Sequence, residues 1–401
     1  METEDLNRLI RELNGQGEAP ASDAPLFELL RPEEPVAEGS ASPAAPELSA
    51  RLVALLAETV RRGGTDLLLV PNAPPTARVN GELVPLGSAH ERLGPPDALD
   101  LVAPSLGAAR RRRFAEAGAC DLSLTVERLG RFRVNLHRTR TGTAAALRVL
   151  PRRVPTLAEL GLPETLAELT RSARGLLLVT GATGSGKSTT LAALVGRIAR
   201  TERRHVVTIE DPVEYEHPHA LSIVEQVEVG ADAPSFADAL VSALRQDPDV
   251  LLVGEMRDAE TARVALTAAE TGHLVLSTLH TNDAAQTVNR IQDLFPGPQQ
   301  GQVRQQLSLA LSAIVCQQLV PRKDGGGRAL AVELLVATDA VRAHLRRGSF
   351  HQLHSEVTLG KRFGMVTMEE SLAALVRSGT IDEAQARLRA SHPDDLAALL
   401  R

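Results

Sequence analysis

Cysteine and aromatic residues are scarce in this sequence. The two cysteines, Cys120 and Cys316, lie far apart, so neither a disulfide framework nor a four-cysteine zinc site is available, and we expect both to be packing residues. Aromatic residues make up 2% of the chain and the formal net charge is -6, whereas nucleic-acid surfaces usually combine basic stripes with stacking rings. The composition therefore predicts no nucleic-acid partner.

Long apolar runs are absent as well. No run approaches the roughly 20 residues that a bilayer-spanning helix needs, and residues 1–5 (METED) are acidic where a secretion signal would be basic. We therefore expect a cytoplasmic location. With 43% hydrophobic residues, a chain of 401 residues can bury a sizeable core divided among two or three domains.

The most informative stretch is a phosphate-binding loop between residues 175 and 190. Residues 176–179 are an apolar run suited to a buried strand, and the glycines that follow allow backbone N–H groups to surround an anion. Lys187 would contact the β- and γ-phosphates of ATP, and Ser188 would offer its hydroxyl to Mg²⁺ at the N-terminus of a helix. The nucleotide-binding residues are expected to be Gly181, Thr183, Gly184, Ser185, Gly186, Lys187, Ser188 and Thr189.

Three further apolar segments, 205–209, 250–253 and 274–278, alternate with helical segments, which predicts a parallel sheet covered by helices on both faces. Polar residues follow each segment, where such a sheet holds its ligand. A single acidic pair could equally be a helix cap or a solvated loop, but three polar clusters beside a phosphate-binding loop indicate ATP hydrolysis. Mg²⁺ coordination would then involve Ser188 together with Glu255 or a residue of 210–214.

The region before the loop is predicted to be a small α+β domain that contains an arginine-rich hairpin, residues 120–136. Arg131 and Arg133 point to the same face of one strand. One interpretation is that these arginines simply lie on a solvent-exposed face of the strand. The other interpretation is that a moving arginine supplies positive charge to the transferred phosphate. Arg133 and Arg148 are the candidates, because their strands come just before a proline-containing linker.

We expect an α/β protein with a P-loop, RecA-like parallel-sheet domain, a smaller N-terminal α+β domain and a helical C-terminal part. Residues 1–50 have the composition of a disordered tether with one short amphipathic helix around residues 6–13. The expected divisions that follow are the α+β domain at 51–150, a linker at 151–160, the ATPase core at 161–295 and the helical part at 296–401.

Four segments, 181–190, 210–214, 245–258 and 270–281, together resemble the secretion and type IV pilus ATPases, and the resemblance extends over about residues 51–385. The resemblance implies that Glu214 is the catalytic base, that Glu255 is the Walker B glutamate and that His273 and His280 are the His-box residues. Without it, either histidine could be a satisfied core residue. Arg133 and Arg148 lie in strands that resemble the arginine-bearing strands of the family.

Within this family, two features make the chain similar to the PilT-type retraction ATPases. It lacks a four-cysteine element, and its segment 340–346 resembles their motif region. The resemblance implies a homohexameric ring that hydrolyses ATP with Mg²⁺ to drive pilus retraction and twitching motility. Its membrane contact would be indirect, through an inner-membrane platform protein at the pilus base. The alternatives are a pilus extension or type II secretion ATPase of the same family, a weakly hydrolysing regulatory subunit and a DNA-handling P-loop ATPase.

Overall fold

The computed structural model describes residues 48–401, except residues 80, 88–90 and 152. The short helix and the tether that we predicted within residues 1–50 fall almost entirely outside the described residues. Among the described helices, none combines the length and the apolar character that crossing a membrane would need.

The first folded region is the expected α+β domain. Its antiparallel sheet has the strand order β3-β2-β1-β6-β5-β4. Alternate side chains of β4, from Cys120 to Val126, are buried, as expected for a strand with one face on a core. The elements are α2 (Ala50–Arg61), β1 (Gly64–Leu69), β2 (Thr76–Val79), β3 (Glu82–Pro85), α3 (Asp97–Val102), η1 (Ala103–Ser105), α4 (Ala108–Ala117), β4 (Ala119–Val126), β5 (Gly130–Thr139) and β6 (Gly142–Val149).

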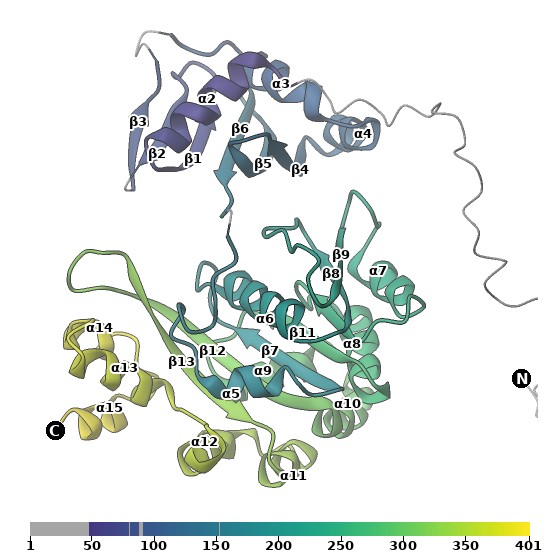
Figure 1. Ribbon diagram of the computed structural model, residues 1–401, viewed down its shortest axis with the longest axis vertical. Coiled ribbons are helices and arrows are strands. Elements are labelled where there is room, and N and C mark those ends of the chain that lie inside the picture. Colours follow the sequence, from purple (N-terminus) through teal and green to yellow (C-terminus); the bar gives the residue numbers. More distant parts are fainter. Residues whose placement is uncertain (1–47, 80, 88–90, 152) are drawn as a thin grey trace, which may run out of the picture. The chain divides into compact units, whose positions relative to one another are not determined.

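The second region contains a seven-stranded sheet in the order β13-β12-β7-β11-β10-β8-β9, and both sheets can be followed in Figure 1. Neighbouring strands are parallel except for β12 and β13. The elements as far as the last crossover helices are α5 (Glu164–Leu169), β7 (Gly175–Thr180), α6 (Lys187–Thr201), β8 (His205–Glu210), β9 (Ile223–Glu228), α7 (Phe236–Ala243), β10 (Val250–Val253), α8 (Ala259–Thr271), β11 (Leu274–Leu279), α9 (Ala284–Asp293) and α10 (Gly297–Ala310).

Strand β7 lies between two hydrophobic cores. Leu176 and Leu178 pack into the core that contains side chains of α8, α9 and α10. Leu177 and Val179 enter the opposite core, which contains side chains of α6. Because successive side chains of a strand point to opposite faces, a strand buried on both sides is apolar throughout. This position explains the uninterrupted apolar run and fixes the loop that follows it.

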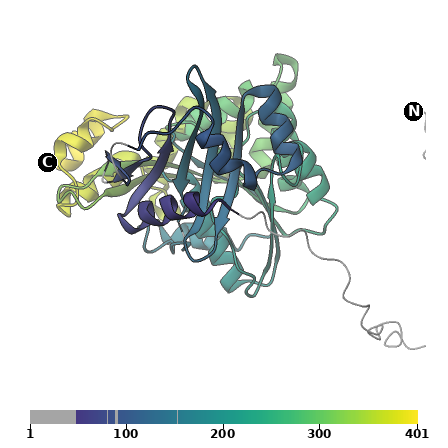
Figure 2. The same ribbon diagram turned by 90° about the horizontal axis from the view of Figure 1, so that it is seen from above.

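The C-terminal part carries the expected helices, but residues 311–336 differ from the expectation. Strands β12 (Leu311–Pro321) and β13 (Arg328–Val336) extend the ATPase sheet, so the division that we placed at residue 295 falls inside this domain. Helix α10 ends at Ala310 and β12 begins at the next residue, so no proline or glycine marks the change. The remaining helices, whose colours change from light green to yellow along the chain in Figure 2, are α11 (Asp339–Arg347), η2 (Phe350–Gln352), α12 (Leu353–Leu359), η3 (Gly360–Phe363), α13 (Met368–Arg377), α14 (Glu383–Arg387) and α15 (Pro393–Leu400).

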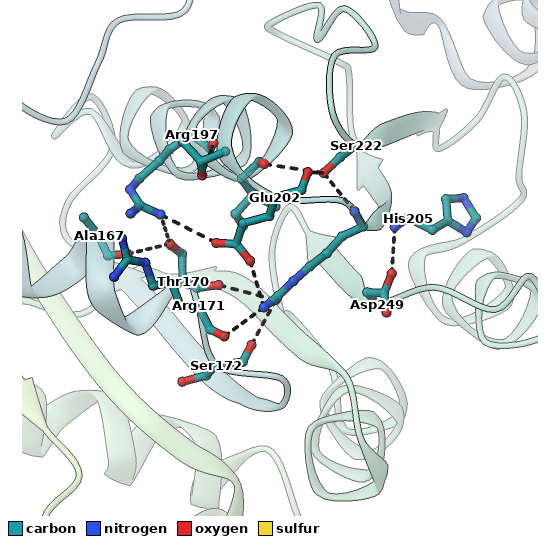
Figure 3. Close-up of polar contacts among 12 residues, drawn as sticks. Ala167, Thr170, Arg171, Ser172, Arg197, Glu202, His205, Ser222 and Asp249 are labelled. Carbon is teal, nitrogen blue, oxygen red and sulfur yellow. Dashed lines mark hydrogen bonds and ion pairs between the residues drawn. The ribbon is translucent and has the colours of Figure 1, made fainter.

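A polar network joins the amino ends of the sheet strands to the surrounding helices (Figure 3). The guanidinium of Arg204 donates to the carbonyl oxygens of residues 171–172 at 2.8 and 2.9 Å and pairs with Glu202 at 2.8 Å. Asp249, just before β10, accepts the backbone N–H of His205 at the start of β8 at 2.8 Å. These bonds hold two strands in register at the edge opposite the phosphate-binding loop.

Candidate nucleotide site

The loop between β7 and α6 has the backbone geometry of an anion cradle. Gly181, Gly184 and Gly186 all have positive φ, at 144°, 77° and 92°. A Cβ atom on Gly181 would lie 2.4 Å from the carbonyl oxygen of Gln317 and 2.5 Å from Oγ of Ser185, so only glycine fits there. This loop leads directly into the first turn of α6, where backbone N–H groups and the helix dipole favour the binding of an anion.

Lys187 is the first residue of α6 and its side chain folds back over the loop. Its Nζ donates to the carbonyl oxygens of Gly181 at 2.8 Å and Ala182 at 3.1 Å. Burial lowers the pKa of Lys187, and the carboxylates of Glu255 and Glu214 oppose that shift. A buried ammonium held by neutral carbonyl acceptors gains strongly from a phosphate, because a hydrogen bond to a charged acceptor is stronger.

Gln317 supports the loop from β12, and sequence reasoning did not identify it. Its Nε2 donates to the carbonyl oxygen of Ser185 at 2.8 Å, and the residue is 1% exposed. The register of β12 with β7, which pairs Cys316 with Thr180, brings Gln317 to this position. A pairing between strands more than 130 residues apart leaves no local signal in the sequence.

His280, after β11, connects the loop lysine to the acidic residue after β10. Its Nδ1 lies 3.3 Å from Nζ of Lys187, and its Nε2 lies 3.3 Å from Oε1 of Glu255. An ammonium can only donate, so Nδ1 accepts and the proton is assigned to Nε2, which donates to Glu255. Burial acts to raise the pKa of Glu255, but Arg257, 2.9 Å away, and His280 outweigh it and hold the pKa below its ordinary value.

The segment after β8 brings Glu214 to the same edge. Its side chain is half-buried, and its charge acts on Lys187. The neighbouring Tyr215 is fixed by a 3.0 Å hydrogen bond between its hydroxyl and that of Thr189 in α6. Glu210, at the end of β8, has its pKa raised by burial despite hydrogen bonds from Thr208 and Gln226. Glu214 is therefore the carboxylate of this segment that lies near the cradle lysine, and it stays the candidate for polarising water.

The two candidate arginines lie directly opposite each other in the N-terminal sheet. The register pairs Arg133 of β5 with Arg148 of β6, and Arg148 in turn with Asp66 of β1. Arg133 Nη1 lies 3.9 Å from Oε1 of Glu214, so the structure brings this arginine to the acidic segment. Arg148 instead pairs with Asp66 at 2.8 Å within its own sheet.

A third arginine of this sheet, Arg131, approaches a buried carboxylate that sequence reasoning did not single out. Glu228, at the end of β9, is 7% exposed. It accepts from Arg110 at 2.8 Å and from Ser123 Oγ at 2.9 Å, and Arg131 lies 3.8 Å away. Charged hydrogen bonds to a buried carboxylate are among the stronger polar contacts in proteins. Glu228 thus anchors the N-terminal sheet to the ATPase sheet.

The structure does not bring His273 to this cluster. It precedes β11, whereas His280 follows it, so the six residues of β11 place the two histidines at opposite ends of the strand, about 20 Å apart. His273 Nδ1 instead lies 3.1 Å from the carbonyl oxygen of Ala268 at the end of α8. His273 therefore makes a hydrogen bond at the amino edge of the sheet, away from His280. Our expectation that both histidines serve one site is corrected accordingly.

Comparison with known proteins agrees with this geometry. The sequence profile of the type II/IV secretion system protein family matches residues 108–396. The chain belongs to this family. It is 42% identical over 346 residues to the type IV pilus retraction ATPase PilT of Pseudomonas aeruginosa, which covers 85% of this chain and 98% of that protein. The type IV pilus ATPase PilU of the same organism is 41% identical over 347 residues, covering 86% of this chain and 90% of PilU.

Among solved structures, the crystal structure of the pilus retraction motor PilT with bound ADP is 44% identical and has a TM-score of 0.80. The alignment covers 88% of this chain and 100% of that one. This member of the secretion ATPase family is therefore an ATPase with an α/β, P-loop fold, and the cradle of Gly181 and Lys187 is its candidate nucleotide-binding loop.

The residues at the cradle of this family member also fit a magnesium ion. Mg²⁺ prefers oxygen ligands, and the cradle edge offers the exposed hydroxyl of Ser188 and the carboxylate of Glu255, whose lowered pKa keeps it ionised. These two residues would hold the ion, directly or through water. When bound, Mg²⁺ would offset the negative charge of the β- and γ-phosphates.

Proposed function

We propose that this protein is the motor ATPase of type IV pilus retraction, and that it works as a homohexameric ring. The observation that carries the proposal is the Lys187–His280–Glu255 chain at the cradle, with Glu214 and Arg133 beside it. Support also comes from relatives named as pilus retraction and twitching motility proteins, which are 42% and 44% identical over most of this chain. The N-terminal domain would move against the ATPase domain as ATP is hydrolysed.

In the proposed reaction, the backbone of residues 181–186 and Lys187 hold the phosphates of ATP. Glu214 accepts a proton from the attacking water. Glu255, oriented by His280, would help to hold Mg²⁺. Arg133 adds positive charge near the γ-phosphate when the N-terminal domain closes. The 3.9 Å separation from Glu214 supports this role, because the arginine already lies beside the proposed base within one chain.

Arg148 is the weaker of the two proposed arginines, because its partner in the structure is Asp66. For Arg148 to act on the nucleotide, this ion pair would have to break. Its side chain is 68% exposed, so the pair is worth about 1 kcal/mol or less and does not prevent such a movement.

A mixing experiment separates delivery of Arg133 within one chain from delivery to a neighbour. If each chain supplies its own arginine, rings that mix Arg133→Ala and Lys187→Ala subunits lack one essential group at every site and stay inactive. Recovery of ATPase activity on mixing would mean that Arg133 crosses to the adjacent subunit, and the within-chain closure would be wrong.

We further propose that the ring acts in the cytoplasm, at the base of the pilus, on an inner-membrane platform protein. Its contact with the membrane would then be indirect. The proposal predicts that the protein binds the cytoplasmic part of that platform in a pull-down with purified components, and that detergent-free lipid vesicles alone do not retain it.

Pilus number in a deletion strain tests the retraction function. Loss of a retraction motor leaves extension unopposed, so the cells should carry more pili than the parent by electron microscopy. Loss of an extension motor would instead leave the cells without pili. A plasmid copy should restore the parental number, and a Lys187→Ala copy should not.

The second candidate is an accessory pilus ATPase, because the chain is also 41% identical to a relative whose name gives a type IV pilus ATPase without stating retraction. An accessory protein would depend on another retraction ATPase in the same cell. Expressing this protein alone in a strain that lacks every retraction ATPase distinguishes the two: retraction would return with the motor, whereas an accessory subunit would leave the cells hyperpiliated.

A further inference from the structure

Three metal-ligand side chains meet in the C-terminal part, far along the chain from the cradle. They are His354 in α12, His392 just before α15 and Asp395 in the first turn of α15. One ligand atom from each lies within 4.8 Å of the others. The two imidazole rings stack with their centroids 3.7 Å apart, and His354 Nε2 lies 3.3 Å from Asp395 Oδ2.

The spacing suits a small tetrahedral metal ion. When ligand bonds are about 2.0–2.1 Å, as for zinc, neighbouring ligand atoms lie roughly 3.3 Å apart. His354 and Asp395 already have this separation, and a ligand atom of the exposed His392 lies within 4.8 Å of both. Two imidazoles and a carboxylate are ligands that zinc accepts readily, whereas Mg²⁺ prefers oxygen ligands alone.

A buried carboxylate lies beside this cluster. Glu369, 1% exposed in α13, accepts the backbone N–H of His392 at 2.9 Å through Oε1. Its Oε2 has no hydrogen-bond partner among the described residues. A buried carboxyl group with one unpartnered oxygen thus positions the His392 backbone next to the cluster.

We propose that His354, His392 and Asp395 form a binding site for a divalent transition-metal ion of the zinc type, with water as the remaining ligand. Such an ion would join two differently packed parts of the protein. Helix α12 packs into the ATPase core through Leu353 and Val357, whereas α15 packs with α13 through Leu396. That second core also contains residues of β12 and β13, so the metal would add a further link between α15 and the ATPase domain.

Zinc titration of the full-length protein, freed of metal by chelation, tests the site. Isothermal titration in the presence of saturating Mg-ADP keeps the cradle residues His280 and Glu255 occupied. The wild type should bind one zinc ion at this site, and His392→Ala should bind it at least about tenfold more weakly, since even residues behind a metal ligand commonly contribute that much. His351→Ala is the matched control, because His351 is exposed, lies in η2 next to α12 and should leave binding unchanged.

Two further measurements make the result decisive. Co²⁺ bound in place of zinc should give the strong visible absorption of a tetrahedral site in the wild type and in His351→Ala, but not in His392→Ala. Zinc should also raise the melting temperature of the first two proteins only. Asp395→Asn, an exposed and nearly isosteric change, covers the case in which His392→Ala fails to fold.

The proposal is overturned if the wild type binds no zinc, which would leave a histidine–aspartate hydrogen bond as the whole role of the cluster. It is also overturned if His392→Ala and Asp395→Asn bind zinc as the wild type does. Equal weakening by His351→Ala would likewise contradict the assigned ligands.

Discussion

The Nε2 atom of His280 lies 3.3 Å from Oε1 of Glu255, and the other ring nitrogen faces the ammonium of Lys187. One imidazole therefore connects residues after β10 and β11 to the nucleotide-binding loop. Because the lysine can only donate to Nδ1, the hydrogen bond to Glu255 is assigned to a proton on Nε2. We therefore propose that His280 is a positioning residue, which would act on ATP through two other side chains.

Removing the imidazole of His280 should lower the turnover of ATP more than its binding affinity. His280→Ala is expected to reduce kcat about tenfold or more, since small displacements of catalytic groups are costly. The apparent affinity for ATP should change only a few-fold, because the loop backbone and Lys187 remain. Steady-state kinetics of both parameters checks this, with the exposed His351→Ala as control. A change in affinity alone would contradict the positioning role.

Glu214→Gln should separate binding from chemistry. The variant keeps the size of the side chain but cannot accept a proton, so turnover should fall by about 10² to 10⁴ while ATP still binds. The matched control is Glu216→Gln, two residues away and exposed, which should change turnover less than about twofold. Weak ATP binding with near-normal turnover at saturation would place the base elsewhere, with Glu255 as the first candidate.

Arg204→Ala should destabilise the ATPase domain. The change removes the ion pair with Glu202 and leaves the carbonyl oxygens of residues 171–172 without their donor. Loss of several charged hydrogen bonds in a half-buried network should cost about 2–4 kcal/mol of the free energy of unfolding. Chemical denaturation measures this, and Arg203→Ala, exposed and adjacent, should have little effect. Equal stability of the two variants would show that the network is not a structural element.

Glu333 should make stability depend on pH. Burial raises the pKa of this carboxyl from 4.5 to about 7, although the N–H of Ala284, 2.9 Å away, opposes the shift. For an acid whose pKa is higher in the folded state, the folded protein binds the proton more tightly, so stability falls as pH rises between these two values. The loss is at most about 3 kcal/mol.

Glu333→Gln removes this titration and keeps an acceptor for the N–H of Ala284. The variant should therefore be more stable than the wild type at pH values above 7, and the difference should vanish near the ordinary pKa. Melting temperatures across this range check the prediction. Glu116→Gln, at an exposed position of α4, should show a difference that does not vary with pH over this range. A constant difference for Glu333→Gln as well would mean that Glu333 is ionised throughout.

The nucleotide site was largely predictable from the sequence. The glycines of the loop, Lys187 and the acidic residues after β8 and β10 follow buried parallel strands, and the carboxyl ends of such strands meet at one edge. This rule alone placed Glu214, Glu255 and His280 together. His273 precedes its strand, and only the family resemblance had grouped it with His280.

Contacts that depend on strand register could not be predicted. Gln317 reaches the loop because β12 pairs with β7, and Arg148 meets Asp66 because β6 pairs with β1. Both pairings join segments that are distant in the sequence, and neither residue belongs to a local pattern that reveals its partner. Glu228 was missed for the same reason, since its burial depends on Arg110 and Ser123, which are more than 100 residues earlier.

The central claim is that ATP hydrolysis at the Glu214 site drives pilus retraction. The most direct test counts retraction events of fluorescently labelled pili in cells whose only copy of this protein carries Glu214→Gln, with Glu216→Gln cells as control. Our account predicts that Glu214→Gln cells extend pili that do not retract, and that the control cells retract them as the parent does. Retraction at the parental frequency in Glu214→Gln cells would contradict it.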